Sequence, residues 1–197
     1  MADNPSGGQV VVLVPVKSFG SAKRRLQPVL SDKQREQLMR ALATRVIAAA
    51  APYPVAVVCD DEAVASWAEA LGAEVLWTPE LGLNGAVRAG VDALAARGVD
   101  HVVIAHGDLA HPEELGALEL GRGVTLVPDQ RDDGTNVLAV PTNAAFNFSY
   151  GPNSFRLHVA EAARLGLDTS IVRSKTLALD IDDPEDLEAL DLSEFLK

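Results

Sequence analysis

Three aspartates in two separate segments of the chain are candidates for binding a metal ion. Asp108 follows the apolar run 101–105, and Asp180 and Asp182 are two residues apart in the segment 179–184. If that segment is extended, the two side chains share one face and lie about 7 Å apart. Carboxylates so placed repel each other unless a cation lies beside them, and their oxygens suit Mg²⁺. The spacing therefore predicts a magnesium site, with a helix cap at Asp108 and a solvated acidic loop at 180–182 as the alternatives.

A basic loop lies near the N-terminus of a chain that is otherwise acidic. Lys17, Lys23, Arg24 and Arg25 follow the apolar run 10–16, with small residues among them. Small residues let backbone N–H groups approach phosphate oxygens, while Lys and Arg side chains neutralise the charge. The loop matches neither a Walker A sequence nor G-x-G-x-x-G. Its position after the first predicted strand favours a triphosphate site over a solvated basic loop.

Two polar loops in the second half of the chain offer hydroxyl groups, amides and backbone donors. They span 133–136 and 149–156, and they contain Thr135, Gly151 and Ser154. Neither loop pairs a nucleophile with a base, and the histidines do not have metal-ligand spacing. The second loop leads into a predicted helix, whose first N–H groups favour anions. We therefore expect these loops to bind an anionic small molecule, with ordinary surface turns as the alternative.

The elements that would position these residues alternate between strands and helices. Strands are predicted at 10–16, 55–59, 74–77, 101–105, 124–127, 137–140, 170–172 and 177–181. Helices are predicted at 32–50, 62–71, 83–97, 155–165 and 184–190. A capping box begins at Ser31, and Asp183 is the expected N-cap of the last helix, with Pro184 at its first position. This alternation predicts one α/β domain at 9–197 with a mostly parallel sheet, after a flexible leader at 1–8.

The composition excludes several functional classes. The chain of 197 residues has 28 acidic and 17 basic side chains, a formal net charge of −11, so we expect no nucleic-acid partner. No apolar stretch approaches the ~20 residues that cross a bilayer, so we expect no membrane partner either. The single cysteine, Cys59, excludes an internal disulfide framework and a cysteine-rich metal site. These features favour a cytoplasmic protein with Cys59 as a buried thiol.

The motifs occur in an order that resembles one known family over about 10–190. They are VPVK at 14–17, AKRRL at 22–26, GLN at 82–84, GDL at 107–109, DGTN at 133–136, GPNSF at 151–155 and DIDDP at 180–184. This pattern resembles the 2-phospho-L-lactate or phosphoenolpyruvate guanylyltransferases of deazaflavin coenzyme (factor 420) biosynthesis. Many relatives continue the motif at Asp108 as Asp-Leu-Pro-Leu, whereas Ala110 and His111 follow Leu109 in this chain.

The resemblance implies a Rossmann-like three-layer nucleotidyltransferase fold of the GT-A type. It implies an enzyme that joins GTP to a phosphorylated three-carbon acid and releases pyrophosphate. The family's metal ligands fall on the same three aspartates, which would hold Mg²⁺. Its acid contacts fall on Thr135, Gly151 and Ser154, and Asn84 is a further expected substrate contact. Lys17, Lys23 and Arg25 are the expected catalytic cations on the β- and γ-phosphates.

Several alternatives stay open at this point. Phosphoenolpyruvate is the expected acid, with 2-phospho-L-lactate and 3-phosphoglycerate as the others, and the product would pass to the downstream deazaflavin transferase. The competing enzymes are a molybdenum-cofactor guanylyltransferase and a sugar-phosphate nucleotidyltransferase. These usually carry a Gly-Gly pair before the arginine, where this chain has the residues SFGS at 18–21. A non-catalytic nucleotide-binding domain is the alternative from another functional class.

Overall fold

The computed structural model describes residues 8–21 and 23–196. The leader predicted at 1–8 therefore lies outside the described residues, apart from Gly8. None of the described helices is long and apolar enough to span a membrane.

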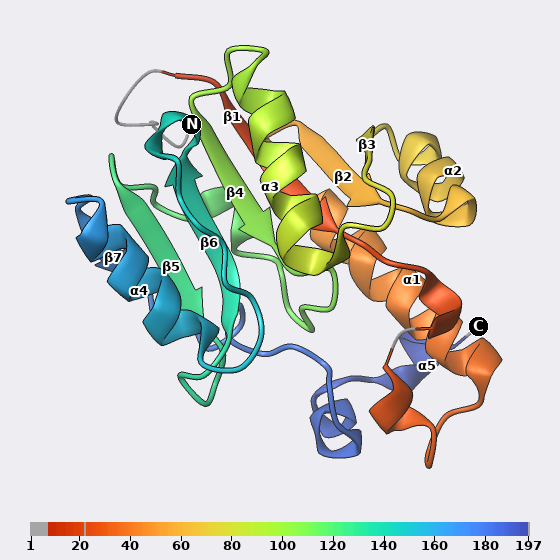
Figure 1. Ribbon diagram of the computed structural model, residues 1–197. Helices are drawn as coiled ribbons and strands as arrows, with labels where there is room; N and C mark the ends of the chain where they lie inside the picture. The colour runs from red at the N-terminus through yellow and green to blue at the C-terminus, as the bar shows by residue number, and fades with distance from the viewer. Residues whose placement is uncertain (1–7, 22, 197) are drawn as a thin grey trace.

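The described residues form a seven-stranded sheet in the order β3-β2-β1-β4-β6-β5-β7 (Figure 1). The strands are β1 (Val10–Pro15), β2 (Val55–Cys59), β3 (Glu74–Trp77), β4 (His101–Ala105), β5 (Val124–Pro128), β6 (Thr135–Pro141) and β7 (Thr169–Ile171). β6 runs antiparallel to both of its neighbours, β4 and β5, and the other strand pairs are parallel. The first residues of β6 therefore lie at the edge where β1 and β4 end.

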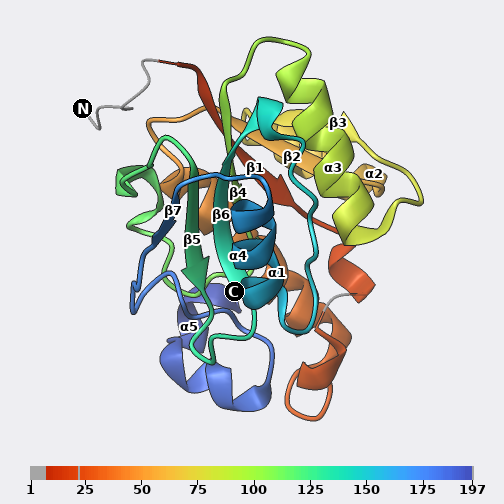
Figure 2. The same ribbon diagram turned by 60° about the vertical axis from the view of Figure 1, so that its left-hand side comes forward.

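Helices cover both faces of this sheet. They are α1 (Asp32–Ala49), α2 (Glu62–Ala70), α3 (Gly82–Ala95), α4 (Ser154–Arg164) and the short α5 (Leu192–Phe195). Val12 and Val14 of β1 pack in one core with α1, α2 and α5, whereas Val11 and Leu13 pack in a second core with α3 and α4. Figure 2 shows α3 and α4 on the same face of the sheet. This alternation of neighbouring side chains confirms the predicted three-layer α/β architecture.

Local sequence signals set where several helices begin. The Ser31 hydroxyl accepts from the backbone N–H of Gln34, whose side chain accepts from the Ser31 N–H, so the predicted capping box is present. Asp61 caps α2 by accepting from two backbone N–H groups. Asp183 caps the last predicted helix, but the segment Pro184–Ala189 is a 3₁₀ helix rather than an α-helix. Cys59 is a buried free thiol, as expected.

The strand predicted at 177–181 is wrong. The segment forms only an isolated antiparallel bridge between Asp180 and Leu109. Leu177 and Ile181 are buried, and the backbone of 179–181 is attached beside β4 by hydrogen bonds to Asp108 and Ala110. The alternating apolar residues therefore cover the end of the core beside β4 without joining the sheet. This attachment is what brings the second acidic segment to Asp108.

Candidate active site

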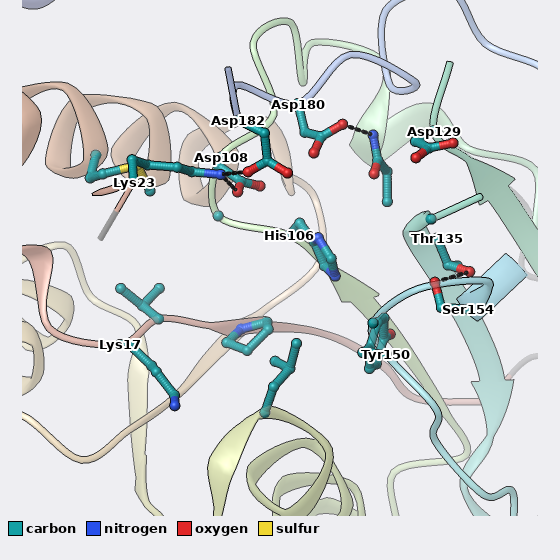
Figure 3. Close-up of a pocket in the computed structure, with 18 of the residues that line it drawn as sticks. Lys17, Lys23, His106, Asp108, Asp129, Thr135, Tyr150, Ser154, Asp180 and Asp182 are labelled. Carbon is teal, nitrogen blue, oxygen red and sulfur yellow. Dashed lines mark hydrogen bonds and ion pairs between the residues drawn. The ribbon is translucent and has the colours of Figure 1, made fainter. Parts of the chain in front are cut away.

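A cavity of about 870 Å³ lies where β1 and β4 end and β6 begins (Figure 3). Its walls come from the loop after β1, the loop after β4, the β5–β6 loop, the segment before α4, and the acidic segment at 180–182. Carboxyl ends of parallel strands are where open α/β sheets bind ligands. All but one of the sequence-predicted site residues line this cavity, so the fold joins segments that are far apart in the chain.

Three carboxylates meet on one side of the cavity. Each of Asp108, Asp180 and Asp182 offers an oxygen, and these oxygens lie within 4.8 Å of one another. Burial, together with the charges of Asp108 and Asp182, raises the pKa of Asp180 to about 6. The Asp180 carboxylate accepts a hydrogen bond from the Asn136 side chain at 3.2 Å. The predicted clustering is present, and the charges of Asp108 and Asp182 disfavour ionisation of Asp180.

Lys23 lies against two of these carboxylates. Its ammonium contacts Oδ2 of Asp108 and lies 2.5 Å from Oδ1 of Asp182. Burial alone would lower the pKa of Lys23, but the charges of Asp108 and Asp182 outweigh it and raise that pKa. Burial likewise acts to raise the pKa of Asp108, and the Lys23 ammonium lowers it overall. Lys23 thus neutralises part of the charge of the three aspartates, whereas we expected it to bind the phosphates of GTP.

The other two expected cations are more exposed. Figure 3 shows Lys17 across the cavity from Lys23, with its ammonium pointing away from the aspartates. Arg25 lies at the rim, where its side chain is 71% exposed and 3.6 Å from a carboxylate oxygen of Asp183. Both residues line the cavity. Positive charge is therefore spread around the cavity, and of these three cations Lys23 makes the closest ion pairs.

The expected acid-binding residues form the opposite wall. The Ser154 hydroxyl lies 3.4 Å from the Thr135 hydroxyl, and the two side chains point toward each other (Figure 3). Gly151 has a φ of 126°, and no atom lies within 4 Å of where a Cβ would be. A backbone conformation that side chains rarely adopt, rather than lack of space, therefore explains glycine there. The wall presents hydroxyls and one open stretch of backbone.

The start of α4 differs from the expectation that its first N–H groups bind an anion. The N–H groups of Asn153 and Phe155 donate to the side chain and backbone of Asp133, and that of Ser154 donates to Gly151. These donors are therefore already used within the protein. The Ser154 and Thr135 hydroxyls and the open backbone at Gly151 are the groups that this wall presents to a ligand.

Asn84 is the sequence-predicted site residue that does not line the cavity. Its side-chain amide donates to the backbone oxygen of Tyr150 at 3.1 Å and accepts from the Tyr150 N–H at 2.7 Å. This paired contact fixes the segment that carries Gly151 against the start of α3. A direct contact of Asn84 with substrate stays a prediction.

Sequence reasoning gave no specific role to three aromatic residues of this region. His106 and Tyr150 line the cavity with ring centroids 5.2 Å apart, and burial lowers the pKa of His106 and raises that of Tyr150. His158 is fully buried behind Thr135. A signal for His158 was present, because it follows Ser154 by four residues and so shares its face of the helix.

Comparison with known proteins identifies relatives over most of the chain. The family model "Guanylyl transferase CofC like" matches residues 10–193. A phosphoenolpyruvate guanylyltransferase of Sphaerobacter thermophilus is 36% identical, over 91% of this chain and 91% of its own length. A 2-phospho-L-lactate guanylyltransferase of Methanothermobacter thermautotrophicus is 33% identical, over 89% of this chain and 81% of its own length.

Solved structures show the same fold. A nucleotidyl transferase of Methanothermobacter thermautotrophicus superposes with a TM-score of 0.64 at 16% identity, covering 96% of this chain and 99% of its own. A cytidylyltransferase of Leptospira borgpetersenii gives 0.63 at 17% identity, covering 96% and 89%. The predicted nucleotidyltransferase fold is thus confirmed. With a family model that spans residues 10–193, the chain belongs to the CofC-like guanylyltransferases and is a nucleotidyltransferase enzyme.

Proposed function

We propose that this enzyme transfers GMP from GTP to phosphoenolpyruvate, giving enolpyruvoyl-2-diphospho-5′-guanosine and pyrophosphate. The observation that carries the proposal is one cavity with an acidic, cation-attracting wall and a hydroxyl wall that suits an anion. Joining two phosphates requires both walls, because one attracts a cation and the other binds the anionic acid. The relative named for phosphoenolpyruvate supports this choice of acid. 2-Phospho-L-lactate is the second candidate, because a relative named for it is almost as similar.

The acidic wall fits a bound Mg²⁺. Asp108, Asp180 and Asp182 offer oxygen ligands, which Mg²⁺ prefers. The Oδ1 atom of Asp108 is buried and has no hydrogen-bond partner among the described residues, so its lone pairs are available. The contact of the Lys23 ammonium with two of the carboxylates supports an affinity for positive charge. These aspartates would hold Mg²⁺, which supplies charge neutralisation for the phosphates when bound.

The reaction needs positioning more than proton transfer. An oxygen of the acid's phosphate forms a bond to the α-phosphorus of GTP, and the bond from that phosphorus to the bridging oxygen breaks. Pyrophosphate leaves with the electron pair. Because the attacking oxygen is already anionic, the protein has to align two anions and neutralise them. Lys17 and Arg25 supply positive charge for the β- and γ-phosphates, while Lys23 offsets part of the charge of the three aspartates. Thr135 and Ser154 hold the acid.

Pyrophosphate release from GTP tests the proposal. It is measured with Mg²⁺ and each of phosphoenolpyruvate, 2-phospho-L-lactate and 3-phosphoglycerate, with ATP and CTP as controls for the base. We expect the highest kcat/KM with GTP and phosphoenolpyruvate. A higher kcat/KM with 2-phospho-L-lactate would still support guanylyl transfer but would overturn phosphoenolpyruvate as the preferred acid. No release with any acid would overturn the proposal.

Two expectations about the cellular setting stay predictions. One is that the product passes to the downstream deazaflavin transferase, and the other is a cytoplasmic location. Co-purification of the enzyme with that transferase in the presence of GTP and phosphoenolpyruvate would test the first. The buried, unpaired Cys59 supports a reducing compartment.

A further inference from the structure

His158 on α4 is a buried polar residue to which the proposed reaction assigns no role. Its exposed fraction is 0%, and it packs behind the hydroxyl wall of the cavity. Both ring nitrogens have partners. The backbone N–H of Ser149 lies 3.0 Å from Nε2, and Oγ1 of Thr135 lies 3.0 Å from Nδ1. The ring therefore connects a backbone amide to one of the two cavity hydroxyls.

These partners fix the position of the single ring proton. A backbone N–H can only donate, so Nε2 of His158 must accept from Ser149 and carries no proton. Burial lowers the pKa of His158 to about 4, so the ring is neutral near pH 7. A neutral imidazole has one N–H, which must then be on Nδ1. Hence Nδ1–H donates to Oγ1 of Thr135.

The direction of that bond determines where the hydroxyl protons go. Thr135 and Ser154 have one hydroxyl proton each, and one of the two is used in the bond between them. The other cannot be donated to His158, because Nδ1 is itself a donor. The structure gives neither hydroxyl a further partner among the described residues. Since both residues line the cavity, the pair always has one O–H left to donate to an acceptor there.

We propose that His158 is a positioning residue that orients the Thr135–Ser154 hydroxyl pair as a donor toward the phosphorylated acid. The inference rests on the proposed function for the identity of the ligand, but the orientation itself rests on the hydrogen bonds of the protein. A pair that always has one O–H to donate favours carboxylate and phosphate oxygens in the ligand.

The tautomer of His158 can be measured directly. Nitrogen-15 NMR of the histidine rings in the wild-type protein at pH 7 distinguishes a protonated Nδ1 from a protonated Nε2. We expect His158 to be neutral with the proton on Nδ1. A proton on Nε2, or on both nitrogens, would overturn the proposal whether or not the enzyme uses phosphoenolpyruvate.

A double-mutant cycle tests the effect on the acid. Thr135→Val removes the hydroxyl that His158 orients, and His158→Phe removes the donor while keeping an aromatic ring. We expect each variant to raise the KM for the acid about tenfold, with the KM for GTP nearly unchanged. The double variant should raise it no more than either single variant, since both remove the same bond. Independent, multiplying effects would contradict a role exercised through Thr135.

Two further variants separate positioning from packing. His158→Asn keeps an N–H that can replace Nδ1–H, so we expect it to recover part of the affinity for the acid that His158→Phe loses. Phe146→Leu is the matched control, because the Phe146 ring packs on His158 at 5.9 Å between centroids without lining the cavity. It should lower the melting temperature and leave the KM for the acid unchanged. If Phe146→Leu raised this KM as much as His158→Phe, packing would explain the effect and the proposal would fail. Absence of pyrophosphate release by the wild-type enzyme would instead be a failure of the proposed function.

Discussion

Replacing Asp180 with asparagine should stabilise the metal-free protein and remove its activity. The carboxylate of Asp180 is partly buried beside Asp108 and Asp182, and burial together with these charges raises its pKa from 3.8 to about 6. At pH 7.5 the side chain is nevertheless ionised. The substitution deletes that unfavourable charge, and its amide oxygen can still accept the hydrogen bond from Asn136.

The size of the stabilisation follows from the pKa. A rise from 3.8 to about 6 corresponds to ~3 kcal/mol against the charged form, and partial contact with solvent reduces this to about 1–3 kcal/mol. Because the folded state binds more protons between these two values, the stability of the wild type falls as the pH rises through that interval. The advantage of Asp180→Asn is therefore full at pH 7.5 and shrinks as the pH approaches 4.

Calorimetry in the presence of a chelator measures this difference. For a chain of this length each kcal/mol shifts the melting temperature by about 2–4 °C, so we expect Asp180→Asn to melt several degrees higher at pH 7.5. Asp92→Asn is the control, since Asp92 is an exposed carboxylate on α3 outside the cavity. Added Mg²⁺ should raise the melting temperature of the wild type and have much less effect on Asp180→Asn. A lower melting temperature for Asp180→Asn at pH 7.5, or the same difference at pH 4.5, would refute the reasoning.

Four further outcomes are expected. Asp182→Asn should leave the circular dichroism spectrum intact and reduce kcat by orders of magnitude, and wild-type turnover at low Mg²⁺ would remove it from the metal site. Ser154→Ala should lower kcat/KM for the acid about ten- to hundredfold, because it removes a hydrogen bond to a charged group worth about 1.5–3 kcal/mol. Gly151→Val should lower kcat/KM for the acid more than Ser154→Ala does, because side chains rarely adopt a φ of 126°. The KM for GTP should change little in both variants. A titration of the acid at saturating GTP measures the effect on the acid. Because burial holds the pKa of folded His158 at about 4, the unfolded state binds the extra proton below pH 6.5. In Asp180→Asn, where the opposing titration of Asp180 is removed, the free energy of unfolding should therefore fall as the pH is lowered from 6.5 to 4. A flat urea-unfolding profile over this range would contradict that pKa.

The sequence predicts well those parts of the site that follow from short-range rules. The ends of β1 and β4 meet at one sheet edge because the strands are parallel, so the loops that carry Lys17 and Asp108 had to lie at the same edge. Capping at Ser31 and Asp183 depends on residues three positions away and is likewise readable. The pairing of Asp180 with Asp182 also followed from their spacing of two residues, whereas their meeting with Asp108 depends on the bridge between Asp180 and Leu109.

The sequence does not predict contacts between residues that are far apart in the chain. The alternating residues 177–181 look like a strand, yet they cover the core and pair with the chain beside β4 in one isolated bridge instead of a ladder. The motif around Asn84 indicates a polar site residue, but only the folded chain shows that its amide is taken by Tyr150. The cation at Lys23 was expected, whereas its contact with carboxylates 85 and 159 residues away depends on the tertiary structure.

Phosphorus-31 NMR of the enzyme with GTP, phosphoenolpyruvate and Mg²⁺ tests the central claim most directly, because it reports the bond that is made. We predict that pyrophosphate appears together with two mutually coupled signals of a new unsymmetrical diphosphate, in equal amounts and at the expense of both substrates. Asp182→Asn should give neither. Conversion of GTP to a guanosine phosphate while the signal of phosphoenolpyruvate stays unchanged would contradict guanylyl transfer to this acid.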